Sequence, residues 1–152
     1  MKVRFQKITE IAKVPQKAHA TDAGFDMTAI SKIIDEYGCV VYGTGIAVEI
    51  PDGYVGLLFP RSSNAKKGLI LTNSVGVIDS GYRGEIIFKY RPTNTYYDFA
   101  GRVRNNADLP SYDIGERIGQ LIIIPYPEIE FEEAKELAKS DRGQGGYGST
   151  GK

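Results

Sequence analysis

The chain has 152 residues, 41% of them hydrophobic, and 19 Lys and Arg residues balance 19 Asp and Glu residues. That length allows one domain with a core, and the balanced charge argues against a general nucleic-acid binder. No apolar run is long enough to span a membrane, the N-terminus lacks a signal-peptide core, and the single Cys39 excludes an internal disulfide. We therefore expect an intracellular, cytoplasmic protein, or a nuclear one in a eukaryotic or viral setting, that binds neither membrane nor nucleic acid.

Short strand patterns recur along most of the chain. Alternation, or runs of β-branched and aromatic residues, predicts strands at residues 2–5, 39–42, 46–50, 54–59, 69–71, 85–90, 118–124 and 128–131. Pro51-Asp52-Gly53 indicates a turn that returns the chain as a partner strand. Helical spacing is confined to about two turns at 132–139 and a short turn at 63–67. The pattern predicts an all-β sandwich or barrel.

Two strands receive a more specific prediction. The run 118–124 is apolar on both faces except for Gln120, so that strand should be central and covered. The buried amide of Gln120 must find a partner, either in neighbouring backbone or in a ligand. Between 91 and 116 the chain is polar and rich in tyrosine, and residues 96–103 have the pattern of a further hairpin.

The stretch from Asn73 to Tyr90 carries the first candidate for chemistry. Apolar runs flank Asp79-Ser80-Gly81, which predicts a hairpin with Asp79 at its mouth. A carboxylate held there can accept a proton from water as a general base. The alternative is an Asp that hydrogen-bonds the backbone of its own turn. This stretch alone leaves both interpretations open.

Two other segments have the chemistry of anion binding. Pro60-Arg61-Ser62-Ser63 follows a strand and offers one guanidinium and two hydroxyls, although an ordinary Ser cap beside a surface Arg would have the same pattern. The C-terminal stretch 142–151 contains five glycines and cannot pack a core. It is either a disordered tail or a mobile arm whose Tyr147 covers a flat ring.

Five stretches, in order and spacing, resemble the motifs of the trimeric dUTP pyrophosphatase (dUTPase) family. They are residues 20–27, residues 60–63, residues 73–84, residues 115–120 and the glycine-rich residues 142–151. The resemblance implies a jelly-roll-like β-barrel of the β-clip type, assembled as a homotrimer with an exchanged C-terminal arm. Residues 1–140 would form the barrel, 91–116 a longer insertion within it, and 141–152 the arm that closes over an active site.

The resemblance also implies the reaction and the roles of single residues. Asp79 would activate the water that attacks the α-phosphorus of dUTP, which gives dUMP and pyrophosphate. This hydrolysis would keep uracil out of DNA and supply dUMP for dTMP synthesis. Tyr82 would lie under the deoxyribose and reject a 2′-hydroxyl. Mg²⁺ would be bound mainly by the triphosphate, with no direct protein ligand and with Asp26 acting through water.

The remaining substrate-binding residues fall into three groups by the part of dUTP that they would contact. Asn73 and the backbone of Gly76, Val77 and Ile78 would read the uracil edge, and Tyr147 would stack on the ring. Phosphate oxygens would be held by Arg61, Ser62, Ser63 and Gln120. The arm would close over the γ-phosphate with Arg142, Gly148, Ser149 and Thr150.

The chain departs from the family's usual motifs at three places, and two other functions follow as alternatives. Tyr147 stands where Phe is usual, Ser63 where Gly is common, and 91–116 is longer than in most members. Arg-Ser-Ser also occurs in the related dCTP deaminases, but these place a catalytic Glu ten positions after the Asp, where this chain has Lys89. The second alternative is an inactive nucleotide-binding regulatory module.

Overall fold

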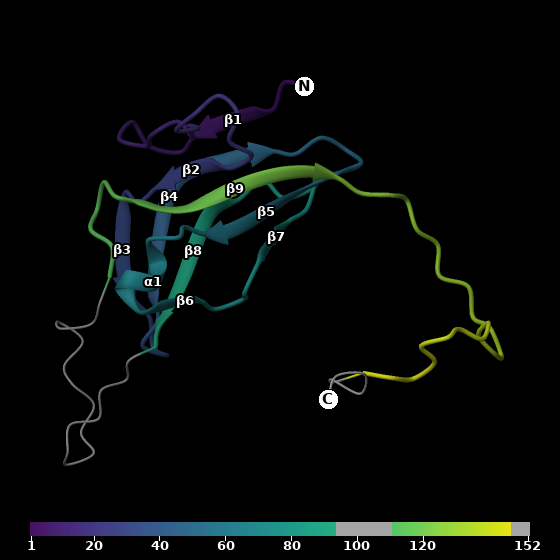
Figure 1. Cartoon of the computed structure of the whole chain (residues 1–152). Coiled ribbons are helices and arrows are strands. Elements are labelled where there is room, and N and C mark those ends of the chain that lie inside the picture. The colour runs from purple at the N-terminus through teal and green to yellow at the C-terminus, as the bar shows by residue number, and fades with distance from the viewer. Residues whose placement is uncertain (94–110, 147–152) are drawn as a thin grey trace, which may run out of the picture.

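The computed structural model describes residues 1–93 and 111–146, which are almost entirely β (Figure 1). Most of the predicted strands are present, several of them with shifted ends. Within the described ranges the elements are β1 (Arg4–Lys7), β2 (Phe25–Thr28), β3 (Ser31–Ile34), β4 (Val40–Glu49), β5 (Tyr54–Pro60), α1 (Asn64–Lys67), β6 (Leu69–Leu71), β7 (Gly76–Ile78), β8 (Glu85–Pro92) and β9 (Arg117–Pro125).

The strands form two antiparallel sheets. One sheet has the order β1-β4-β8-β6, with β3 also paired to β4, and the other has the order β2-β9-β5-β7. β9 therefore lies between two neighbours, as its apolar sequence predicts. Its coverage is less complete than predicted, because Ile118 and Leu121 are buried whereas Ile124 on the other face is 40% exposed.

The core lies between the sheets and contains a cluster of aromatic rings. Tyr42, Phe88, Tyr90 and Tyr112 are all fully buried. Tyr90 donates a hydrogen bond to the carbonyl of Ile118, and Tyr42 bonds both backbone groups of Tyr112. Burial raises the pKa of Tyr42 to about 12 and also raises the pKa of Tyr90. The hydroxyls of both residues therefore stay protonated and can donate hydrogen bonds. These bonds satisfy polar groups that the apolar interior would otherwise leave unpaired.

Two predicted hairpins are wrong, for the same reason. β7 and β8, which flank Asp79, belong to different sheets, and so do β4 and β5, which flank Pro51-Asp52-Gly53. Each turn therefore carries the chain from one sheet to the other. The local sequence indicates a turn correctly but does not say which strand the next segment pairs with. That choice is made by burial between the sheets.

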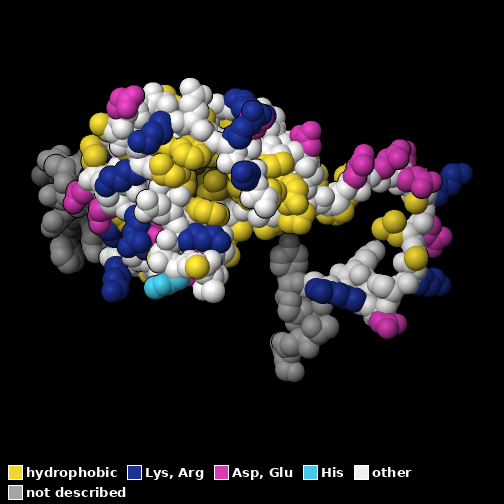
Figure 2. Space-filling model, turned by 90° about the horizontal axis from the view of Figure 1, so that it is seen from above, with side chains coloured by type: hydrophobic (Ala, Val, Ile, Leu, Met, Phe, Trp, Pro, Cys, Tyr) yellow, Lys and Arg dark blue, Asp and Glu magenta, His cyan; other side chains and the backbone are white. Residues whose placement is uncertain are grey.

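Beyond Pro125 the predictions of a strand at 128–131 and a helix at 132–139 are also wrong. The described residues 126–144 are exposed and contain neither element, and they project from the body in Figures 1 and 2. Phe131 is 95% exposed, so no described residue covers the apolar face that a strand or a two-turn helix would need to bury. Within the described residues there is no helix long and apolar enough to cross a membrane.

Candidate active site

One carboxylate organises the residues expected to bind phosphate. Asp26 on β2 accepts a hydrogen bond from Nε of Arg61 at 2.9 Å and another from Arg117 at 2.9 Å. Arg61 follows β5 directly, and Arg117 begins β9. Because β9 lies between β2 and β5, three neighbouring strands bring these side chains together. Arg61 is thus held in place, and the alternative of an unattached surface Arg does not apply.

Ser63 and Gln120 present polar groups without partners at the same end of the sheet. The Ser63 side chain makes no capping bond to α1, and its buried hydroxyl has no hydrogen-bond partner among the described residues. Gln120 lies opposite Asp26 on β2 and opposite Phe59 on β5. Its amide likewise makes no side-chain bond within the described part of the chain. The partly exposed Gln120 amide is therefore available to a ligand, whereas the Ser63 hydroxyl is a buried polar group whose hydrogen bond is not made by any described residue.

A glycine makes room for Gln120. A Cβ added at Gly24 would lie 2.3 Å from Oε1 of Gln120, far closer than atoms can pack. Gly24 precedes β2 by one residue, so its missing side chain allows the amide to lie against the backbone next to Asp26. The conformation of Gln120 thus depends on a residue without a side chain.

Asp79 lies on a turn that carries the chain from one sheet to the other, between β7 and β8. Its side chain is exposed, and its carboxylate forms no hydrogen bond with any described residue. The turn is closed instead by the backbone, because the N–H of Tyr82 donates to the carbonyl of Asp79 at 3.1 Å. The alternative of an Asp side chain that only supports its own turn is thus not observed. Asp79 borders a cavity of about 400 Å³ together with Tyr54, Val55 and Tyr126.

Tyr82 is fixed beside Asp79. Its hydroxyl donates to the carbonyl of Glu85 at 3.0 Å, and its ring lies over Gly84, where a Cβ would be 2.3 Å from the hydroxyl. The side chain is still 42% exposed. A rigid, half-exposed aromatic ring next to a carboxylate with no partner is a suitable surface for a sugar.

The residues expected to read uracil lie on an edge strand. β7 pairs only with β5, so the outer N–H and C=O groups of Gly76, Val77 and Ile78 have no partner strand in this sheet. Val77 is 60% exposed, and Asn73 is also exposed, just before Ser74 at φ 60°. Free backbone groups beside an exposed amide suit hydrogen bonds to a base edge.

Asp79 and the phosphate-binding residues do not meet within one chain. Gly56 pairs with Ile78, so Asp79 lies level with Val55 at the start of β5, whereas Arg61 follows the end of that strand. Six residues of extended strand span about 20 Å. A carboxylate must come within hydrogen-bond reach of the water that it activates. Within the described residues of one copy, Asp79 and Arg61 are therefore too far apart for both to contact the same phosphate group.

The deaminase alternative fails at Lys89. The ammonium of Lys89 forms an ion pair with Asp35 and lies 5.4 Å from the centre of the Tyr37 ring. The hydrogen bond to Asp35 raises the pKa of Lys89, and its partner Lys89 lowers the pKa of Asp35. Both groups are thus held in their charged states, and a protonated amine cannot accept the proton that the deaminase base must take.

The acidic side chains present fit magnesium only in an outer sphere. Among the described residues no three His, Cys, Asp or Glu side chains cluster as metal ligands would. Both oxygens of Asp26 accept hydrogen bonds from arginines, so this carboxylate is better placed to hold a water than to bind the ion directly. A triphosphate would supply the inner oxygens.

The arm is described only at its start. Arg142 donates from Nε to the carbonyl of Gly145 at 2.9 Å and is exposed. Tyr147, Gly148, Ser149 and Thr150 lie outside the described residues, as does the predicted hairpin at 96–103.

Two residues in this arrangement were missed from the sequence. Arg117 is one of six residues in the fourth motif, and Gly24 is one of eight in the first, but nothing in their spacing indicates an ion pair or a close contact. In the structure Arg117 and Gln120 lie on either side of the buried Ile118 and Gly119, and the sequence alone carries no signal of this arrangement.

Comparison with known proteins places this arrangement in one family. A family model described as dUTPase matches residues 10–95. The deoxyuridine 5′-triphosphate nucleotidohydrolase of Clostridium tetani is 36% identical, over 99% of this chain and 97% of that protein. The enzyme of the same name from Cutibacterium acnes is 41% identical, over 91% of this chain and 85% of that protein.

Solved structures agree with the sequence relatives. The dUTPase of Staphylococcus bacteriophage 80alpha, bound to dUPNHPP, superposes with a TM-score of 0.82 at 30% identity, covering 99% of this chain and 98% of that one. A mutant dUTPase from phage phi11 of S. aureus, described with a structural Mg(II) ion, has a TM-score of 0.70 at 28% identity, covering 90% and 99%. The sequence relatives, the shared fold and the five motifs together show that the chain belongs to the dUTPase family.

Proposed function

We propose that the protein hydrolyses dUTP to dUMP and pyrophosphate, with Asp79 as the general base. The observation that carries this proposal is the Asp79 turn, where an exposed carboxylate without a partner lies next to the fixed ring of Tyr82. The carboxylate takes a proton from a water, and the water attacks the α-phosphorus while pyrophosphate leaves. No covalent intermediate with the protein is needed.

The other residues position the substrate and neutralise its charge. Asn73 and the free edge of β7 hold uracil, and the Tyr82 ring lies under the deoxyribose where a 2′-hydroxyl would clash. Arg61, Ser62, Ser63 and Gln120 hold the phosphate oxygens, and the arm closes over the γ-phosphate. Attack at phosphorus depends chiefly on such positioning and charge stabilisation.

Asp26 would hold a magnesium ion through a water, and the substrate's triphosphate would supply the oxygens bound to the ion. When bound, magnesium would supply positive charge that offsets the negative charge of the phosphate oxygens. Asp26 has a second part in the free protein, because it keeps Arg61 in place before the substrate arrives.

The complete site is shared between copies in a homotrimer. The separation of Asp79 from Arg61 along β5 supports this proposal, and so does the outer face of the four-stranded sheet. The strand register places Val77, Leu57 and Ile122 on the same face as Gln120. Val77 is 60% exposed, so the described residues leave part of this apolar face uncovered. Packing it against another copy would bury it and would bring a second chain's Asp79 towards Gln120.

The arm, 141–152, is the third part of the site. We propose that residues 1–140, with the insertion 91–116, act as the barrel unit and that the arm closes over a site built by other copies. The exposed course of the described chain after Tyr126 supports this division, because an exposed segment that projects from its own barrel can reach a neighbour.

Product analysis tests the function. The full chain is given dUTP, dCTP, dTTP and UTP separately with magnesium, and release of pyrophosphate and ammonia is measured. We expect pyrophosphate from dUTP alone. Ammonia from dCTP would mean that the protein is a deaminase despite Lys89, and no turnover of any substrate would leave a nucleotide-binding module.

A further inference from the structure

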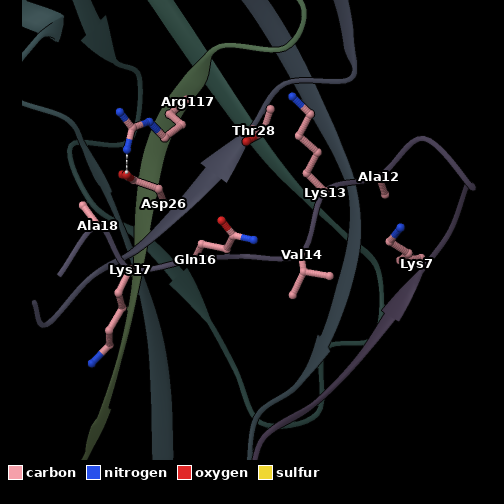
Figure 3. Close-up of a pocket in the computed structure, with 10 residues that line it drawn as sticks. All are labelled: Lys7, Ala12, Lys13, Val14, Gln16, Lys17, Ala18, Asp26, Thr28 and Arg117. Atoms are coloured by element: carbon pink, nitrogen blue, oxygen red, sulfur yellow. Dashed lines mark hydrogen bonds and ion pairs between the residues drawn. The ribbon is translucent and has the colours of Figure 1, made fainter. Parts of the chain in front are cut away.

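A basic pocket opens beside the residues proposed to bind phosphate, and its lysines have no part in the mechanism above. It has a volume of about 540 Å³, and four of its lining side chains, Lys7, Lys13, Lys17 and Arg117, are cationic (Figure 3). The single acidic lining residue is Asp26. That carboxylate is already paired with Arg61 and Arg117, so it does little to offset the lysines. In a chain with balanced charge, this is a local excess of positive potential.

The wall of the pocket is fixed at two points. Ala12 is buried, and Gln16 exchanges backbone hydrogen bonds with Asp26 at 2.7 and 3.3 Å. Lys13 lies between these anchors, so its backbone is held even though its side chain is exposed. Figure 3 shows Lys13 extending towards Thr28 and the Gln16 amide lying between Lys13 and Lys17. The pocket thus has neutral hydrogen-bonding groups among its charges.

The three lysines differ in the contacts that their ammonium groups make with described residues. Lys17 points away from the others in Figure 3, and its ammonium lies 4.9 Å from the centre of the Phe25 ring. Lys7 makes a long bond of 3.4 Å to the carbonyl of Glu10. Lys13 has no side-chain partner among the described residues. Lys13 and Lys7 are therefore the cations most available to an anion.

The side chains that line the pocket indicate which kind of anion it would bind. No aromatic side chain lines the pocket, so a nucleobase would find no stacking partner. Several lysines and an arginine favour a compact anion with many oxygens. The contact with Asp26 makes the pocket continuous with the residues that hold the triphosphate.

We propose that this pocket binds inorganic pyrophosphate next to the substrate's phosphate site, so that the leaving product has a second place to bind. This inference rests on the proposed function for its choice of oligophosphate, but the pocket itself does not depend on turnover. Binding is electrostatic and weakens as salt is added.

Calorimetric titration of the full-length protein with inorganic pyrophosphate tests the proposal. The protein is first saturated with a non-hydrolysable dUTP analogue. We expect pyrophosphate still to bind, about threefold more weakly in Lys13→Gln and about tenfold more weakly in the double variant with Lys7→Gln, as exposed ion pairs predict. Lys135→Gln, in the exposed tail, is the matched control and should leave the affinity unchanged.

Three outcomes would overturn the proposal. They are unchanged pyrophosphate affinity in the double variant, complete loss of pyrophosphate binding once the analogue is bound, and an equal weakening of the analogue itself by both lysine substitutions. The last two would assign the lysines to the substrate's own site. Product analysis with dUTP separates this failure from failure of the function, because hydrolysis can be present whether or not the lysines bind pyrophosphate.

Discussion

The candidate site has a phosphate half, around Asp26, and a second half, around Asp79. The Asp26 carboxylate holds two guanidiniums, whereas the Asp79 carboxylate has no partner among the described residues. Asp26 is mostly buried and fixes Arg61 and Arg117, while Asp79 is exposed on a turn between sheets. The cations are thus ordered before substrate binds, which lowers the entropy cost of binding it. The Asp79 carboxylate accepts no hydrogen bond from a described residue, which suits the general-base role that we propose for it. The same type of side chain is thus suited to two different roles because its surroundings differ.

Removing the Asp79 carboxylate is the most direct test of this contrast. We expect Asp79→Asn to lower kcat for dUTP by about 10³-fold, the usual contribution of a general base. Because the side chain forms no hydrogen bond or ion pair with a described residue, the melting temperature and analogue binding should be unchanged. Asp52→Asn, on the other exposed turn between sheets, is the matched control and should retain full activity. A variant that fails to fold would make Asp79 structural instead.

Mixing two inactive variants tests whether the halves come from different copies. Asp79→Asn and Arg61→Ala are unfolded together in a one-to-one ratio and refolded, and dUTP turnover is compared with each variant alone. If neighbouring copies complete one another's sites, about a quarter of the sites in random mixed assemblies regain both side chains. Activity no higher than that of the separate variants would place both residues in one chain's site.

Truncation after Ser140 removes residues 141–152, the arm that we propose closes over the site. Residues 126–144 are exposed, so the shortened protein should melt within a few degrees of the full chain. We expect kcat/KM for dUTP to fall roughly 100-fold, since the γ-phosphate loses its cover. A full-length variant with Leu137→Ser, which alters only an exposed side chain, should keep its activity. Full turnover by the truncated chain would mean that the arm is no lid.

The sequence predicts the contents of the site better than its arrangement. Asp79, Arg61 and Gln120 could be singled out because motif order survives in a linear sequence. That Asp26 binds Arg61 could not be, because the contact joins residues from β2 and the end of β5. The same limit explains the two wrong hairpins. A turn is encoded locally, but the sheet that the next strand joins is decided by packing over the whole core.

The tail shows the opposite error. Alternation at 128–131 and helical spacing at 132–139 are real patterns, yet the described chain forms neither element there. A strand needs a neighbour and a two-turn helix needs a packing surface, and the described residues supply neither to this segment. Periodicity predicts which face would be buried but not what would cover it.

Substitutions at two glycines can distinguish effects on the candidate site from effects on the core. A Cβ at Gly24 would meet the flexible amide of Gln120, whereas one at Gly119 would lie 2.0 Å from the buried ring of Phe88. We expect Gly24→Ala to lower kcat/KM about tenfold with little change in stability, since the amide can move aside. Gly119→Ala should instead lower the free energy of unfolding by about 3 kcal/mol. Kinetics and denaturant unfolding on both variants check this, and equal losses of stability would contradict it.

The smallest expected effect is on the stability of the protein in acid, and it comes from Glu116, which directly precedes β9. Backbone N–H donation from Asp113, and then the Lys67 ammonium at 3.0 Å, lower the pKa of Glu116 below its ordinary value of 4.5. A lowered folded pKa contributes stability that is fully present above about pH 4.5 and is lost as the pH falls through the folded value. Half-exposed pairs of this kind contribute about 0.2–1 kcal/mol. Unfolding in denaturant from pH 7 to pH 3 should therefore show a shallower loss of stability in Glu116→Gln than in the parent. Glu136→Gln, in the exposed tail, should follow the parent curve, and identical curves for all three would show that the Glu116 contacts do not stabilise the ionised form.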